Sequence, residues 1–300
     1  MRIIITGGAG FIGSNLANSL AKSNEVFVLD DLSFGQKSNL DGNSELIICD
    51  VRNIPDYLYK LDPDYIIHLA AKSSAPMFYE EPMKGADVNV NGFIRIMEFA
   101  KDAGVKKVVY ASTSSLYSRT KPPHKEDIEL IPGSFYELSK LANEHTARIY
   151  DELHGVKSVG LRFFSVYGPN ELHKKQYANI ATQFLWLMRK NQRPTIYGDG
   201  KQTRDFVYVT DIMDGITRAM KSNFNGILNL GSGKSYSFND VVGLLNGVLK
   251  KNIKAKHANN PIKNYVEHTH SDISLAKKKI GFNPKVDLKE GLQLLAEHYK

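Results

Sequence analysis

The sequence predicts an α/β protein with a doubly wound parallel sheet and a smaller mixed α/β lobe toward its C-terminal end. Two observations lead to this class: short runs of branched apolar residues alternate with helical stretches, and the alternation breaks after residue 165. Strands and helices in alternation are typical of a parallel sheet that helices cover on both faces. The runs that predict its strands are 2–6, 25–30, 45–50, 64–71, 107–112 and 157–164.

Helices are expected between most of these strands, because apolar residues recur there with a helical period. The expected helices are 11–22, 86–103 and 136–154, followed by about 177–190, 211–221, 238–250, 272–280 and 287–299. Short strands are expected at "PTIYG", "DFVYV" and "GILNLG". We therefore expect a larger domain of residues 1–165, joined by returning segments near 204–232, and a smaller lobe of residues 166–203 and 233–300.

The composition bounds the class of protein. The chain has 300 residues, of which 42% are hydrophobic and 24% charged, as is ordinary for a soluble globular protein. A single cysteine, Cys49, allows no internal disulfide and fits a reducing compartment. The chain begins on a strand rather than a signal peptide, and no apolar run approaches the roughly 20 residues that span a bilayer. We expect a cytoplasmic protein without a membrane partner.

The net charge of +7 raises the question of nucleic acid, but the basic residues are scattered along the chain. Neither a zinc-finger spacing nor a basic stripe interleaved with aromatic residues is present. A basic excess also suits an anionic small substrate, whose local concentration it raises in a cleft. We expect no nucleic-acid partner.

A glycine-rich segment, "ITGGAGFIG", joins the first strand to the first helix. Gly7, Gly10 and Gly13 have the spacing G-x-x-G-x-x-G, which allows a tight turn and lets a pyrophosphate approach the helix N-terminus. The second strand ends in Asp30, whose carboxylate is placed to accept hydrogen bonds from an adenosine ribose. Asp31 adds a charge that repels a 2′-phosphate. The larger domain is therefore predicted to be a Rossmann-type domain that binds NAD rather than NADP.

Two further strand ends carry matching signals. Asp50, in "CDV", is placed to meet the adenine amino group, although an exposed strand-end aspartate is the plainer alternative. Leu69, Ala70 and Ala71, in "HLAA", present small residues where a cofactor passes close to the backbone. The preceding His68 is interpreted as a core residue.

With these residues assembled, the chain resembles the extended short-chain dehydrogenase/reductase family, in its nucleotide-sugar epimerase/dehydratase branch. The resemblance covers nearly all of the chain and rests on several ordered motifs. They are "TGGAGFIG", "LDDLSFG", "CDVR", "HLAA", "NVNG", "YASTSSLYS", "YELSK", "LRFFSVYGP", "IYGDGKQTRDFVYVTD" and "DISLAKKKIGF".

The resemblance assigns the catalytic residues. Tyr136 matches the catalytic acid/base, Lys140 the lysine that holds the nicotinamide ribose, and Thr113 the residue that hydrogen-bonds the reacting oxygen. Tyr136 and Lys140 lie four residues apart and so share a helix face. A nearby ammonium, together with a positively charged nicotinamide, favours the phenolate and lowers the phenol pKa.

The resemblance also implies a set of binding residues. Besides the catalytic pair, the implied NAD-binding residues are Gly7, Gly10, Phe11, Ile12, Gly13, Asp30, Asp31, Asp50, Val51, Leu69, Ala70, Ala71, Asn89 and Phe164. The smaller lobe is implied to hold the nucleotide sugar, and the implied substrate-binding residues are Thr113, Ser165, Asn179, Arg204, Phe206 and Thr269. A core phenylalanine is the default interpretation of Phe206. No metal site is expected, because His268 and His270 have no evident third ligand.

The residues after Thr113 discriminate between reactions. Dehydratases of this branch usually carry Asp-Glu there and decarboxylases often carry Ser-Glu, whereas this chain has Ser114 and Ser115. Reversible redox at one sugar carbon is then the economical chemistry, and the resemblance implies 4-epimerisation of UDP-glucose and UDP-galactose. A nucleotide-sugar reductase or dehydratase is the first alternative, and a non-catalytic NAD-binding regulator is the second.

Two departures from the family pattern concern the substrate. Ser165 replaces a frequent asparagine, and the segment 259–272 lacks a recognisable Arg-x-Gly-Asp, with Lys263 as a substitute for the arginine.

Thr269 matches the position beside the sugar C2 substituent, and so small a residue leaves room for an N-acetyl group. The resemblance implies a homodimer through the helices at 86–103 and 136–154, because related enzymes form such dimers. Phe93, Ile96, Met97 and Ala100 are compatible with such a seam and equally with a single-chain core.

Overall fold

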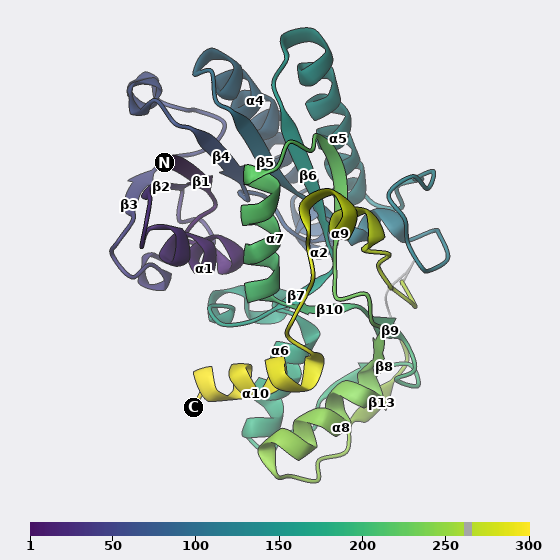
Figure 1. Cartoon of the computed structure of the whole chain (residues 1–300). Coiled ribbons are helices and arrows are strands. Elements are labelled where there is room, and N and C mark those ends of the chain that lie inside the picture. Colours follow the sequence, from purple (N-terminus) through teal and green to yellow (C-terminus); the bar gives the residue numbers. More distant parts are fainter. Residues whose placement is uncertain (261–265) are drawn as a thin grey trace.

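The computed structural model describes residues 1–260 and 266–300, which are built around a parallel sheet of seven strands (Figure 1). The strand order is β11-β6-β5-β4-β1-β2-β3, so the winding direction reverses between β1 and β4. The predicted doubly wound sheet is thus confirmed. Its strands are β1 (Arg2–Thr6), β2 (Glu25–Asp30), β3 (Glu45–Ile48), β4 (Tyr65–His68), β5 (Lys107–Thr113), β6 (Ser158–Phe163) and β11 (Gly226–Leu230).

Helices cover both faces of the sheet, and the alternation of β1 side chains shows how. Ile3 and Ile5 belong to a buried cluster with Leu16 of α1 (Phe11–Leu20) and Ile216 of α7 (Val209–Lys221). Ile4 points to the other face and packs in the cluster formed with α4 (Gly92–Asp102) and α5 (Phe135–His154). Both faces are therefore apolar, as a parallel sheet requires.

The helix expected at 86–103 forms, but its first part is a π-helical segment. The chain forms α2 (Ala75–Glu80), α3 (Pro82–Ala86) and a π-helical segment (Asp87–Asn91) before α4 begins. Short 3₁₀ turns occur at Lys37–Asn39, Asp56–Leu61, Ser114–Tyr117 and Leu172–Tyr177.

Helix α5 is limited by standard caps that fix its register. The Ser134 hydroxyl accepts a hydrogen bond from the Glu137 amide at 3.2 Å, and the helix ends at Gly155, whose φ is +70°. The expected span of 136–154 is thus nearly correct. The buried face of the helix includes Tyr136 and Lys140.

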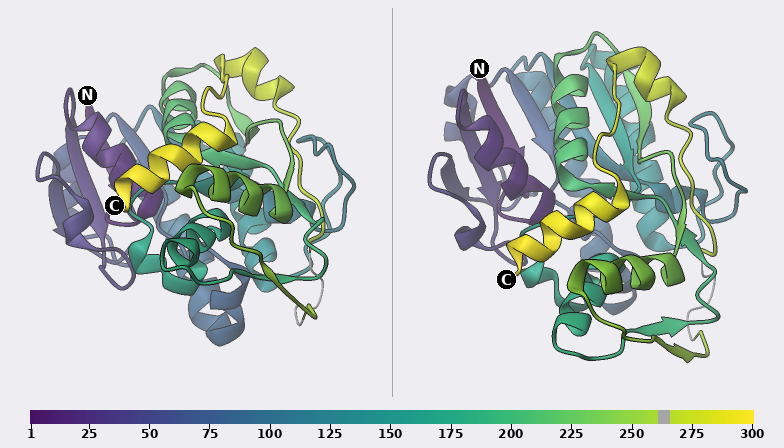
Figure 2. Two further views of the ribbon diagram at one scale, coloured as in Figure 1. Left: turned by 90° about the horizontal axis from the view of Figure 1, so that it is seen from below. Right: turned by 60° about the horizontal axis from the view of Figure 1, so that its bottom comes forward.

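The smaller lobe contains three helices that pack together, α6 (Ile180–Arg189), α8 (Phe238–Leu249) and α10 (Leu288–His298) (Figures 1 and 2). Phe184, Leu245 and Leu292 belong to their shared core. The smaller lobe also contains three two-stranded sheets: β7 (Ser165–Tyr167) with β10 (Phe206–Tyr208), β9 (Thr203–Arg204) with β12 (Tyr236–Ser237), and β8 (Thr195–Tyr197) with β13 (Lys256–Ala258).

The chain returns to the main sheet after entering the lobe. Strand β11 pairs with β6, and α7 covers the face that α1 also covers. Helix α9 (Ser274–Ile280), which lies within the segment expected to belong to the lobe, packs instead against β11 and α7. Among the residues that the structure describes, none of the helices has the length and apolar character needed to cross a membrane.

Candidate active site

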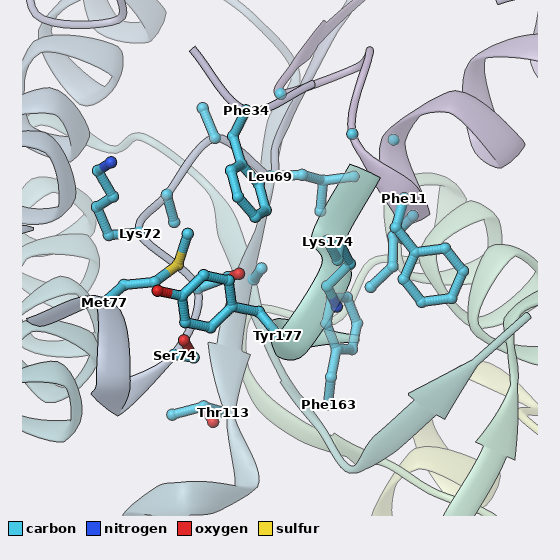
Figure 3. A pocket seen from close by; sticks show the side chains of 18 of the residues that line it. Phe11, Phe34, Leu69, Lys72, Ser74, Met77, Thr113, Phe163, Lys174 and Tyr177 are labelled. Carbon is cyan, nitrogen blue, oxygen red and sulfur yellow. The ribbon is translucent and has the colours of Figure 1, made fainter. Parts of the chain in front are cut away.

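A cavity of about 590 Å³ opens at the carboxyl ends of the central strands, where the winding direction reverses. Ligands of open α/β sheets bind at this kind of switch point. Figure 3 shows side chains that reach the cavity from separate elements, including Phe11 of α1, Thr113 of β5 and Met77 of α2. Most of the predicted site residues line it.

The glycine-rich turn is built for close backbone approach. Gly7 has a φ of +67°, and a Cβ at this position would lie 2.6 Å from the Ala70 nitrogen. A Cβ on Gly13 would lie 2.2 Å from the Gly7 carbonyl oxygen, so α1 can start this close to β1 only with glycine there. Gly10 precedes the first turn of α1, whose free amides favour a phosphate.

The two acids at the end of β2 have different environments. Asp30 is buried and accepts hydrogen bonds from the amides of Ala9 and Leu32, both at 2.9 Å. Burial raises its pKa, against the lowering effect of these hydrogen bonds. Asp31 is exposed and accepts a hydrogen bond from the Ser33 amide at 2.9 Å. Both line the cavity, as predicted for a site that rejects a 2′-phosphate.

Asp50 also lines the cavity, but its carboxylate already has a partner. Arg52 donates to it from Nε at 3.0 Å and 3.1 Å and from Nη2 at 2.5 Å, and these hydrogen bonds lower the Asp50 pKa. The guanidinium also pairs with Asp87 on the π-helical segment. The predicted contact with an adenine amino group therefore has to share the carboxylate with Arg52. Beside it, Val51 lines the cavity as well.

Leu69, Ala70 and Ala71 line the cavity as expected, whereas Asn89 does not. The Asn89 side chain is buried, accepts a hydrogen bond from the Lys72 amide at 2.8 Å and donates to the Ser139 hydroxyl at 3.1 Å. It therefore holds the chain after β4 against α5. This is a correction to its expected direct contact with the cofactor.

The three predicted catalytic residues come together from β5 and α5. Thr113, Tyr136 and Lys140 are each at most 7% exposed, and all three line the cavity. Lys140 Nζ donates to the Ala111 carbonyl oxygen at 2.9 Å, which fixes the ammonium beside the end of β5. The Thr113 hydroxyl accepts a hydrogen bond from the Ser115 amide at 3.1 Å and is also hydrogen-bonded to Tyr136.

Burial dominates the ionisation of this group. It raises the pKa of Tyr136 to about 12, although the hydrogen bond with Thr113 acts in the opposite direction. It lowers the pKa of Lys140 to about 8, against the raising effect of the Glu144 charge. The expected lowering of the phenol pKa is therefore not a property of the protein alone, because the lysine does not outweigh desolvation. His68, hydrogen-bonded to Thr6 at 2.8 Å, has its pKa lowered to about 3 by burial and is neutral.

At the substrate end, Ser165, Asn179, Arg204 and Thr269 line the cavity. The Asn179 amide donates to the Ser165 hydroxyl at 2.9 Å and accepts from the Ala181 amide at 3.0 Å, so its orientation is fixed at the start of α6. The Arg204 guanidinium donates to two carbonyl oxygens and lies 5.5 Å above the Phe238 ring. The Thr269 hydroxyl accepts a hydrogen bond from the Asp205 amide at 3.2 Å.

Two aromatic predictions have different outcomes. Phe164 lines the cavity and stacks against Tyr117. Phe206, expected to contact the substrate, is instead 2% exposed in the lobe core, edge-on to Tyr167. Strand β10 pairs with β7, and the apolar ring points into the cluster that this pair shares with α6 and α8. Lys263 lies outside the described residues.

Sequence reasoning missed one side of the cavity. The Tyr177 hydroxyl donates to Glu80 of α2 at 2.5 Å, and its ring lies 6.0 Å from that of Phe34. Phe34, Met77 and Tyr177 all line the cavity (Figure 3). They come from three loops or short helices with no motif in common, so only their long-range packing could have revealed them.

The residues present fit NAD. The close-packed glycine turn leaves room for a pyrophosphate, Asp30 and Asp31 lie at the ribose end, and Lys140 lies at the far end beside Thr113. Over residues 1–260 and 266–300, no group of three His, Cys, Asp or Glu side chains is arranged to hold a metal ion. His268 is hydrogen-bonded to Thr203, and His270 to a backbone carbonyl oxygen.

Comparisons with known proteins identify the family to which the chain belongs. A model of the NAD dependent epimerase/dehydratase family matches residues 3–231. A putative UDP-glucose 4-epimerase of Methanocaldococcus jannaschii is 34% identical over 99% of this chain and 98% of its own length.

Two solved structures have the same fold. A UDP-N-acetylglucosamine 4-epimerase from Methanobrevibacter ruminantium, in complex with UDP-N-acetylmuramic acid, matches with a TM-score of 0.94 and 32% identity over 99% of this chain and 97% of the other. A UDP-glucose 4-epimerase from Thermotoga maritima, with UDP-glucose, gives a TM-score of 0.94 and 31% identity over 100% and 98%. Together with the family model, which spans more than half of the sequence, these matches show that the chain belongs to the NAD-dependent epimerase/dehydratase family.

Proposed function

We propose that this chain is an NAD-dependent UDP-sugar 4-epimerase, which interconverts UDP-glucose and UDP-galactose through a 4-keto sugar. The observation that carries the proposal is the buried set of Tyr136, Thr113 and Lys140 in a cavity whose described lining residues include no carboxylate beside them. Among the described lining residues, the carboxylates are those of Asp30, Asp31 and Asp50, which lie at the carboxyl ends of β2 and β3. Dehydration needs a separate acid and base, and this end of the cavity supplies only Ser114 and Ser115 after Thr113.

Tyr136, Thr113 and Lys140 have separate roles in the reversible oxidation of the sugar. Tyr136 takes the proton from the sugar 4-hydroxyl as that carbon becomes a ketone, and returns it when the alcohol is restored. Thr113 donates or accepts a hydrogen bond at the same oxygen, and the Lys140 ammonium stabilises the phenolate. Bound NAD would accept the hydride from the sugar C4 and give it back to the other face of the keto sugar, so that no cofactor would be consumed.

The test is an assay of the purified protein with UDP-galactose and catalytic NAD, following UDP-glucose by anion-exchange chromatography or NMR. We expect both sugars to approach the same equilibrium mixture from either side. Net consumption of NAD(P)H, or loss of water from the sugar, would identify the reductase or dehydratase alternative. NAD binding without turnover of any nucleotide sugar would favour the non-catalytic regulator.

Arg204 and Asn179 are proposed to hold the nucleotide diphosphate from the lobe side. A guanidinium suits paired phosphate oxygens, and Arg204 is positioned on β9 at the cavity wall. Ser165, which replaces the asparagine frequent in the family, accepts a hydrogen bond from the Asn179 side-chain amide. It therefore helps to orient Asn179. The nucleotide-sugar substrate therefore lies between the lobe and the carboxyl ends of β4 and β5.

Thr269 is proposed to admit N-acetylated sugars. It lines the cavity, and its small side chain is fixed by the Asp205 amide. Replacing it with tyrosine fills the space for a C2 substituent, so we expect Thr269→Tyr to lose at least about tenfold in kcat/KM for UDP-GlcNAc relative to UDP-glucose. Parallel assays of the two sugars provide the measurement, with turnover of UDP-glucose by the same variant as its control. Failure of the unmodified enzyme to convert UDP-GlcNAc would contradict the proposal.

A homodimer through α4 and α5 is also proposed, but not through the residues first considered. Phe93, Ile96, Met97 and Ala100 are each at most 1% exposed and belong to the single-chain core. The same two helices, which contact each other, instead expose Ile94, Leu138, Ile149 and Leu153. The last three repeat with helical spacing along α5, so they form one apolar row.

Leu153→Glu is therefore expected to convert a dimer to a monomer, because it places a charge in that row. Size-exclusion chromatography with light scattering gives the mass. The matched control is Leu294→Glu on α10, an exposed leucine outside the row, which should leave the mass unchanged. A monomeric unmodified protein would rule out the seam.

We also infer that the enzyme acts in the cytoplasm, since its single cysteine is buried and unpaired, and that nucleic acid is not a partner.

A further inference from the structure

A buried ion pair lies directly behind the catalytic residues and is not part of the proposed chemistry. Glu144 of α5 and Arg162 of β6 have side chains that are 7% and 4% exposed. Arg162 Nε donates to Glu144 Oε1 at 2.9 Å, and Nη2 donates to Oε2 at 2.7 Å. A bidentate pair of this kind fixes the two groups in direction as well as in distance.

The same carboxylate holds the strand that carries two parts of the site. Ser112 donates its hydroxyl to Glu144 Oε1 at 2.5 Å. Ser112 stands between Ala111, whose carbonyl oxygen accepts from Lys140, and Thr113, which bonds to Tyr136. Glu144 therefore contacts the residue between the two anchoring points of the catalytic group, without lining the cavity itself.

Glu144 also lies one helical turn beyond Lys140 on the same buried face of α5. Residues four apart on a helix are neighbours, so its negative charge acts directly on the ammonium. The pair thus has two connections to the site: a hydrogen bond that orients the end of β5, and a charge that acts on the lysine.

We propose that Glu144, with its charge balanced by Arg162, is a positioning residue for 4-epimerisation that keeps Lys140 protonated and aligned with the end of β5. This inference rests on the proposed function, because it assigns Glu144 a role in that reaction. Glu144 touches neither substrate nor cofactor and acts through Lys140 and Ser112.

The groups around Lys140 define the electrostatic argument. On its own helix it faces Glu144 and Tyr136; β4 contributes His68, which is neutral, and β6 contributes Arg162 behind Glu144. Burial lowers the pKa of Lys140 to about 8, and the Glu144 charge is the opposing influence. Removal of that charge lets the pKa fall further, so that less ammonium remains at working pH. Removal of Arg162 leaves the Glu144 charge without its counter-charge, and the Lys140 pKa then rises.

The experiment compares Glu144→Gln with Arg162→Gln in the NAD-bound protein. Glutamine keeps the length and one acceptor oxygen of Glu144 while removing its charge. The first readout is the Lys140 pKa, from the pH titration of 13C-labelled lysine, with the signal assigned by its absence in Lys140→Arg. The second is the alkaline limb of the kcat profile for UDP-galactose. The titration needs no substrate, so it tests the inference even if the proposed reaction is wrong.

We expect Glu144→Gln to lower the midpoints of the Lys140 titration and of the alkaline kcat limb by about one pH unit. At a pH above the midpoint, this is a decrease of about tenfold in the fraction of Lys140 that is protonated. Arg162→Gln should move them in the opposite direction. Asp211→Asn is the matched control: Asp211 is a buried acid that accepts two backbone hydrogen bonds, from Lys285 and Val286, and does not line the cavity. It should lower the melting temperature without shifting either midpoint.

Unchanged midpoints in both glutamine variants would overturn the proposal and leave Glu144 a purely structural residue, like Asp211. Shifts in the same direction in both variants would also overturn it. A general loss of packing would move both midpoints alike, whereas the removal of opposite charges moves them in opposite directions. If Glu144→Gln alone does not fold, the double variant Glu144→Gln/Arg162→Gln leaves no unpaired buried charge. The same tests then apply to that protein, with Arg162→Gln as its reference.

Discussion

Replacing Tyr136 with phenylalanine is expected to lower kcat for the interconversion of UDP-galactose and UDP-glucose by about 10²–10⁴-fold, the usual contribution of a positioned acid/base. The phenol is the only group of the catalytic set that exchanges a proton with the sugar in the proposed reaction. Its ring is buried and lies 5.8 Å from that of Phe78, and phenylalanine preserves this packing. The fold and NAD binding should therefore be kept, as fluorescence titration with NAD will show.

Tyr110→Phe is the matched control for this substitution. Tyr110 is a buried tyrosine on β5 that does not line the catalytic cavity, so its loss of a hydroxyl should leave kcat within about twofold. Activity of Tyr136→Phe equal to that of the control would show that another group carries the proton. Loss of both activity and NAD binding would point to a structural effect instead.

Gly13→Ala has the second large expected effect, on both cofactor affinity and stability. The added methyl carbon would lie 2.2 Å from the Gly7 carbonyl oxygen and 2.7 Å from the Gly8 Cα, so the turn and α1 must separate. Overpacking of this kind destabilises by about 1–3 kcal/mol, and the displaced turn no longer presents its amides to a pyrophosphate. Denaturant unfolding gives the free energy, and calorimetric titration with NAD gives the affinity.

The control is Gly243→Ala in the middle of α8, where a Cβ meets no atom within 4 Å. Alanine in a helix interior is favoured over glycine by about 0.5–1 kcal/mol, so this variant should be slightly more stable and bind NAD normally. If Gly13→Ala behaves like Gly243→Ala, the close packing of the first turn does not limit the cofactor site.

The features predictable from the sequence were those that local rules determine. Periodic apolar runs located the strands of the main sheet, and β1 and β2 have the expected bounds. The four-residue spacing placed Tyr136 and Lys140 on one face, since a helix fixes that relation wherever it packs. The sequence could not show which face is buried, and it could not show that desolvation raises the pKa of the phenol to about 12.

Other features depend on packing that local rules do not describe. Asp50 lines the cavity as predicted, but it is also engaged by Arg52, which bridges to Asp87 on a π-helical segment that apolar periodicity does not reveal. Phe206 is buried because β10 pairs with β7, a contact between strands about forty residues apart. The hydrogen bond between Tyr177 and Glu80 spans 97 residues, and neither side chain belongs to a recognisable pattern.

The path of the chain through β11 has a consequence for synthesis on the ribosome. Strand β11, which pairs with β6, and helix α7 are made after the first part of the smaller lobe, residues 166–203. Until residue 230 has emerged, the edge of β6 is unpaired and apolar residues such as Val159 and Leu161 lack part of their cover. Long-range pairing of this kind forms late and leaves a nascent chain open to aggregation. The Rossmann-type domain is therefore completed only as the last third of the chain is being made.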